Sequence, residues 1–195
     1  MIQGTTLARC LAAALLLLAC GCRSTRRLEL DYVAEPADDV GAGALVYVAP
    51  VHDRREVRPK LLGELGYGTR VEADRDEESL AKALGMALRE ELRALGFRCR
   101  LDERQAQLAV GIVEWSWTER GNDAVFRAVL DVAILDPLAS RVRDRARVTH
   151  EETARGTPYR GAWPALTAAH PEAFAAVVHK CLRDNRVVLD ALAAR

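Results

Sequence analysis

The fold is set by residues 107–153, which read QLAVGIVEWSWTERGNDAVFRAVLDVAILDPLASRVRDRARVTHEET. β-Branched and aromatic residues, which favour strands, are frequent here, and residues that favour turns interrupt them at 121–123 and 136–137. Three successive strands are therefore predicted, over residues 107–117, 124–136 and 141–153.

The third predicted strand has an arginine at every second position: Arg141, Arg143, Arg145 and Arg147. Because alternate side chains of a strand point to the same side, the four guanidinium groups are expected on one face of the sheet. On the preceding strand, Arg127 and Asp131 are expected to face outward, and the core face is formed by Phe126, Ala128, Leu130, Val132 and Ile134. A tight connection between the two strands would set Asp131 opposite Arg145.

Two tryptophans are expected to join this outer face. Through the turn at Gly121-Asn122, Trp115 and Trp117 share the parity of Arg127. Trp and Arg are enriched at protein interfaces, so the face with Trp115, Trp117 and the arginines is predicted to dock a protein partner or anionic lipid headgroups. In one alternative the arginine row is a solvated strand face that prevents edge aggregation. In another, a loop at 155–169 covers the tryptophans as a second small core.

One helix is predicted before these three strands in the sequence, and a second one after them. Residues 77–95 place Leu80, Leu84, Leu88, Leu92 and Leu95 on one stripe, with Asp76 as cap and Gly96-Phe97 as a Schellman end. Residues 170–194 form the second helix, with Pro171 at its first position and Asn185 inside its apolar stripe. A central strand is expected at 44–51, and loops at 52–75 and 155–169. The order β-α-β-β-β-α predicts an α+β two-layer sandwich, a mostly antiparallel sheet with both helices on one face.

The N-terminal residues are expected to be a targeting segment. Arg9 precedes an apolar run at 11–19, which is too short to span a bilayer and has the size of a signal-peptide core. The run ends Leu17-Leu18-Ala19-Cys20, which resembles the lipobox of bacterial lipoproteins. The resemblance implies cleavage after residue 19 and a lipid on Cys20, and Gly21 after the cysteine implies the outer membrane. An ordinary secretory signal and a frame shifted to Cys22 are the alternatives.

The chain is thus divided into a signal peptide (1–19), a lipidated cysteine and tether (20–43) and a periplasmic domain (44–195). A short edge strand is expected within the tether, where Leu28, Leu30 and Tyr32 alternate with acidic residues. Cys99 and Cys181 are expected to be free thiols, although an oxidising compartment would permit a bridge.

Signals of chemistry are weak. The net charge of zero gives no support to nucleic-acid binding. The sequence has no G-x-S-x-G, no Gly-rich phosphate loop and no metal-ligand spacing, and His150-Glu151-Glu152 lacks the second histidine of a zinc motif. We therefore predict no catalytic activity, no cofactor and no metal.

Several short motifs bear a family resemblance. Val51, Asp53 and Arg55 form Val-x-Asp-x-Arg, a Gly-rich segment runs from Gly63 to Arg70, and the helix ends Leu-x-x-Leu-Gly-Phe at Phe97. Over residues 44–192 the chain resembles the YajG-type envelope lipoproteins, and more loosely the auxiliary lipoproteins of ABC-type lipid transport systems. The resemblance implies a non-enzymatic binding or accessory role in the periplasm. A lipid or glycolipid transport accessory and, less in keeping with the motifs, a hydrolase are the alternatives.

Replacing Cys20 with Ser should leave an unlipidated precursor, because only a thiol accepts the diacylglycerol. Labelling with a radioactive fatty acid measures this directly. Label incorporated equally by the wild type and the Cys20→Ser variant would refute the assignment.

Overall fold

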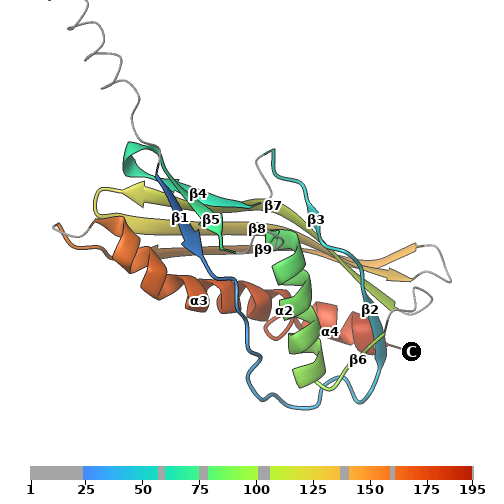
Figure 1. Cartoon of the computed structure of the whole chain (residues 1–195). Coiled ribbons are helices and arrows are strands. Elements are labelled where there is room, and N and C mark those ends of the chain that lie inside the picture. The colour runs from blue at the N-terminus through green and yellow to red at the C-terminus, as the bar shows by residue number, and fades with distance from the viewer. Residues whose placement is uncertain are drawn as a thin grey trace, which may run out of the picture.

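The computed structural model describes residues 24–56, 60–74, 79–100, 106–136, 141–158 and 161–194. The predicted signal peptide and Cys20 lie outside these residues. Within them, nine strands form one mixed sheet, and its helical layer consists of α2 (Leu80–Ala94), α3 (Ala162–Cys181) and α4 (Arg186–Ala193). Figure 1 shows the helices on the same side of the sheet, which confirms the predicted α+β class and its layers. No helix among the described residues is long and apolar enough to cross a membrane.

The three predicted strands are confirmed as β7 (Ala106–Arg120), β8 (Asp123–Asp136) and β9 (Arg141–Ala154). They pair antiparallel in sequence order and form the two longest ladders. The other edge of β7 accepts three short strands in parallel: β2 (Leu45–Val48), β3 (His52–Asp53) and β4 (Leu61–Leu65). The remaining strands are β5 (Thr69–Ala73), antiparallel to β4, with β1 (Thr25–Leu28) parallel to β5 and β6 (Arg98–Cys99) parallel to β2.

The loop predicted at 52–75 is wrong, because this segment adds β3, β4 and β5 to the sheet. Its glycines and charged residues are typical of a loop, but the segment also contains a short apolar pattern, in which Leu62, Leu65 and Val71 are buried. Gly63 lies opposite Trp117 of β7, and a Cβ at that position would collide with the Trp117 backbone. The glycine therefore permits the close approach of β4 to β7 rather than marking a loop.

The C-terminal part also departs from its prediction. Residues 162–169 are helical instead of a loop, and Pro171 lies inside α3 rather than at its start. The single predicted helix is two helices, because a new one begins after Asn185, whose Oδ1 accepts a hydrogen bond from the Val188 amide at 3.3 Å. Asn185 is thus a helix cap and not a polar residue inside an apolar stripe.

The first long helix follows its prediction closely. Ser79 caps it, with Oγ accepting from the Lys82 amide at 3.3 Å, whereas Asp76 lies outside the described residues. At its end the Phe97 amide donates to the Leu92 carbonyl at 2.9 Å, and Gly96 has a φ of 84°. This is the predicted Schellman end, which requires a left-handed residue. Cys99 and Cys181 are free, as predicted.

The predicted position of the two tryptophans is wrong, because Trp115 and Trp117 are buried on the helix side of the sheet. The β7–β8 turn contains only Gly121 and Asn122, so Arg120 pairs with Asp123 and Trp117 lies opposite Phe126 of the core face. A β-bulge at Val113 then brings the even-numbered residues before it to the same side, where Leu108, Val110 and Ile112 are buried. The bulge lets both halves of β7 contribute to one core.

Helix α3 covers these tryptophans with an aromatic cluster. The Phe174 ring lies 5.6 Å from that of Trp115, and Trp117 Nε1 donates to His170 Nδ1 at 3.2 Å. His170 is almost fully buried, and burial lowers its pKa to about 4. The hydrogen bond requires an unprotonated Nδ1, and the lowered pKa keeps the imidazole neutral at neutral pH.

Between pH 6.5 and pH 4 the unfolded chain binds a proton at His170 that the folded protein does not. The contribution of neutral His170 to the free energy of unfolding should therefore be fully present above pH 6.5. It should be lost as the pH drops toward 4, by on the order of 3 kcal/mol. The variant His170→Asn keeps a hydrogen-bond acceptor but does not titrate, so its urea-unfolding free energy should fall less over this interval. Equal pH dependence in the two proteins would contradict the assignment.

Candidate functional site

Helices α2, α3 and α4 cover one face of the sheet, and no described helix covers the other face, which is hollowed. A hollow of about 570 Å³ crosses β3, β7, β8 and β9. Its floor contains small residues on β7 and β8: Ala109, Gly111 and Ala133. Because these side chains are short, longer polar ones at the rim enclose the space; His52, Arg54, Asp131, Arg145 and Arg147 are among them. We call this hollow the outer groove.

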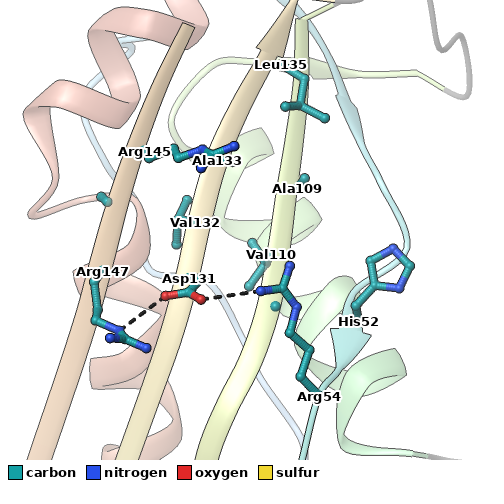
Figure 2. A pocket seen from close by; sticks show the side chains of 12 residues that line it. His52, Arg54, Ala109, Val110, Asp131, Val132, Ala133, Leu135, Arg145 and Arg147 are labelled. Carbon is teal, nitrogen blue, oxygen red and sulfur yellow. Dashed lines mark hydrogen bonds and ion pairs between the residues drawn. The ribbon is translucent and has the colours of Figure 1, made fainter. Parts of the chain in front are cut away.

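A short charged bridge crosses the middle of the outer groove, as Figure 2 shows. Asp131 of β8 accepts from Arg54 Nη1 at 3.4 Å on one side and lies 3.2 Å from Arg147 Nε of β9 on the other. Arg54 reaches Asp131 by lying over Gly111, where a Cβ would stand 2.9 Å from its Nε. Both arginines are about 60% exposed, so water screens these pairs and each is worth about 0–1 kcal/mol.

The predicted arginine row is divided by the structure. Arg145 and Arg147 line the outer groove, but Arg143 leaves it. Arg143 donates to Asp136 Oδ2 at 2.9 Å and to the Ala194 carbonyl after α4 at 2.9 Å. The cause is a register shift between Ile134 and Leu135, which makes Arg143 a bulged residue. Arg143 therefore ties α4 to the sheet.

The expected pairing of Asp131 with Arg145 is also wrong. Arg147 is the residue opposite Asp131, and Arg145 lies opposite Ala133. β9 begins with Arg141 opposite Asp136 and Val142 opposite Leu135. The bulge at Arg143 then shifts the pairing by one residue, so that Asp144 lies opposite Ile134. Arg141 is thus at the far end of the sheet and does not line the outer groove.

Arg127 lies on the outer face as predicted, but acidic neighbours neutralise it. Its Nε is 3.0 Å from Glu114 of β7, and its Nη1 is 3.9 Å from Glu151 of β9. The outer groove, by contrast, has three arginines and a single carboxylate among its lining residues. A planar guanidinium donates two parallel hydrogen bonds to a carboxylate or phosphate, so the groove is suited to an anionic group.

Arg54 was missed by sequence reasoning, although it lies within the Val-x-Asp-x-Arg motif. The motif residues themselves have a structural role. The Arg55 guanidinium pairs with Asp53 at 2.7 Å and donates to the carbonyls of Leu61 and Trp115, which joins β3 to β4 and β7. This buried pair fixes the strand end that delivers Arg54 to the groove.

A second polar cluster, also missed, lies on the helix side. Glu91 of α2 is fully buried; it accepts from Tyr32 Oη at 2.6 Å and from Arg183 Nε at 2.8 Å. Burial and the bond to Glu91 raise the pKa of Tyr32. The cluster ties the predicted tether to α2 and to the residues after α3, and Leu28 and Leu30 of the same segment are buried. A glutamate three residues after Leu88 on the apolar stripe was the available signal.

Among the described residues, no three metal-ligating side chains are gathered in one place.

Comparisons with known proteins show the fold and no family. No family model matches the chain, and no curated protein matches its sequence. Among solved structures, protein XCC0632 from Xanthomonas campestris, of family model DUF330, aligns with a TM-score of 0.60 at 15% identity, over 87% of this chain and 95% of that one. At this identity the likeness concerns the fold alone.

Two further structures are less similar. A homolog of the neuraminyllactose-binding hemagglutinin from Helicobacter pylori aligns with a TM-score of 0.48 at 7% identity, over 86% of this chain and 97% of that one. The PelC dodecamer from Paraburkholderia phytofirmans gives 0.40 at 15% identity, over 76% and 92% of the two chains.

Because Arg143 and Arg147 make different contacts, replacing each of them with Ser should change the stability of the protein by different amounts. Arg143→Ser should destabilise the protein by about 1–3 kcal/mol, because it removes charged hydrogen bonds to Asp136 and to the end of α4. Arg147→Ser should change stability by less than about 1 kcal/mol, because its ion pair is exposed. Urea unfolding of the two variants measures both values; the reverse order of stabilities would show that the assigned roles are wrong.

Proposed function

We propose that the chain is a lipid-anchored protein of the bacterial outer membrane that faces the periplasm and acts by binding, not by catalysis. The observation that carries the binding role is the uncovered outer face of the sheet. There the outer groove presents Arg54, Arg145 and Arg147 around a single aspartate, while α2, α3 and α4 lie on the other side.

The anchor is supported by the lipobox-like residues that end at Cys20 and by the positive and apolar segments before them. Acyl chains add about 0.8 kcal/mol for each buried methylene, so a multiply acylated cysteine holds a protein on a bilayer without a spanning helix. The resemblance to YajG-type lipoproteins is consistent with this role, and the family itself stays a proposal.

The chemistry of the outer groove favours an acidic protein surface as partner. Arg145 has no acidic residue opposite it, and Arg54 and Arg147 share one carboxylate. Carboxylates of a partner would complete their hydrogen bonds. A lipid or glycolipid carrier would need an apolar groove instead, and the charged rim of this hollow does not suit acyl chains.

A photo-crosslinking amino acid at Leu135, on the rim of the outer groove, tests this in the native membrane. The full-length lipidated protein should give a defined crosslinked adduct, which mass spectrometry identifies. The adduct should be lost when Arg145 and Arg147 are both replaced by Ser, and should weaken at high salt because exposed charges are screened.

Arg127→Ser is the matched control. It removes an arginine from the same face of the sheet, but the charge of this arginine is already neutralised by Glu114 and Glu151. This variant should keep the adduct. An adduct that survives the loss of Arg145 and Arg147, or that consists only of phospholipid, would contradict an acidic protein partner.

A further inference from the structure

Strand register determines where the N-terminal segment leaves the domain. Thr25 pairs with Arg70, Arg70 with Glu64, and Glu64 with Thr118, so Thr25 and Thr118 lie in one row across the sheet. β1 runs parallel to β5, β5 antiparallel to β4, and β4 parallel to β7, which makes β1 antiparallel to β7. The chain before Thr25 therefore departs toward the β7–β8 turn at Gly121-Asn122.

The reach of this segment is short. Cys20 precedes Thr25 by five residues, which span at most about 18 Å when fully extended. A lipid on Cys20 would consequently hold Thr25 within about 18 Å of the bilayer. The turn end of the sheet, rather than its other end, would be the part nearest to the membrane.

Side chains at this end have the chemistry of a membrane surface. The Arg26 guanidinium lies over the Trp163 ring at 4.9 Å, and Trp and Arg are favoured at the level of lipid headgroups. Arg120 and Arg155 are exposed beside the turn. The nearby Glu119 carboxylate is engaged by the Gly66 amide at 2.6 Å. Positive charge beside a bilayer attracts anionic headgroups.

We propose that this turn end of the domain, with Arg26, Trp163, Arg120 and Arg155, rests on anionic lipid headgroups. The inference rests on the lipid anchor of the proposed function and adds an orientation to it. Along β7, Gly111 of the outer groove lies seven residues beyond Thr118, about 23 Å farther from the turn. The outer groove is thereby held away from the anchoring membrane and open to a periplasmic partner.

Fluorescence quenching in vesicles tests the orientation. The full-length lipidated protein carries a genetically encoded fluorescent amino acid at Asn122, in the turn, or at Arg141, at the far end of the sheet. The vesicles contain phosphatidylcholine and phosphatidylglycerol, with a nitroxide quencher on a lipid headgroup. Quenching should be several-fold stronger at residue 122 than at residue 141, and the difference should shrink in phosphatidylcholine alone.

Charge reversal supplies the matched control. The triple change Arg26→Glu, Arg120→Glu and Arg155→Glu should lower quenching at residue 122 to the level at residue 141. Reversal of the exposed Arg93, Arg98 and Arg100 changes the net charge equally, but these residues lie near β6 at the far end, so quenching should be unaffected. Equal quenching at both probe sites, or equal effects of the two triple variants, would overturn the orientation.

Flotation with the vesicles separates this proposal from the anchor on which it rests. Wild-type protein should float, and the Cys20→Ser variant should not. Equal flotation of the two would overturn the lipid anchor, and the orientation with it. If flotation depends on Cys20 but quenching is equal at residues 122 and 141, the orientation alone would be overturned.

Discussion

Strand β7 holds the sheet together, and its β-bulge at Val113 is the constraint on which the rest depends. The strand pairs with β8 along one edge and with β2, β3 and β4 along the other. A regular strand of this length would turn Leu108, Val110 and Ile112 to the face opposite the two tryptophans. The bulge places Ile112 and Trp115 on the same face, so one continuous core forms beneath the helices.

Because the core lies on one face only, the opposite face is free to carry charge. Small residues on β7 and β8 keep that face low, and Arg54 crosses Gly111 to reach Asp131. The outer groove thus forms because the side chains on the outer face of β7 and β8 are short, while Arg54 after β3 and Arg145 and Arg147 of β9 line its rim. A second bulge, in β9, removes Arg143 from this set and uses it to fasten α4.

Two buried polar contacts connect elements far apart in the chain. Glu91 on α2 binds Tyr32 and Arg183, and His170 on α3 binds Trp117. A buried polar group costs free energy unless it is paired, so each contact specifies one arrangement of helix and strand. The Glu91 contact also secures the segment that the sequence predicts to be a tether, because it holds Tyr32 against α2.

Elements with strong local signals could be predicted from the sequence. The stripe of Leu84, Leu88 and Leu92 and the Gly96 end defined α2, and β-branched runs between turn residues defined β7, β8 and β9. The directions of Trp115, Trp117 and Arg143 depend on contacts between distant strands and helices, and so does the addition of residues 61–73 to the sheet. The physical reason is that side chains alternate along a strand with a period of two. A single bulge, or a turn shorter by one residue, reverses every face that follows, and only the pairing of distant strands fixes where such a shift occurs.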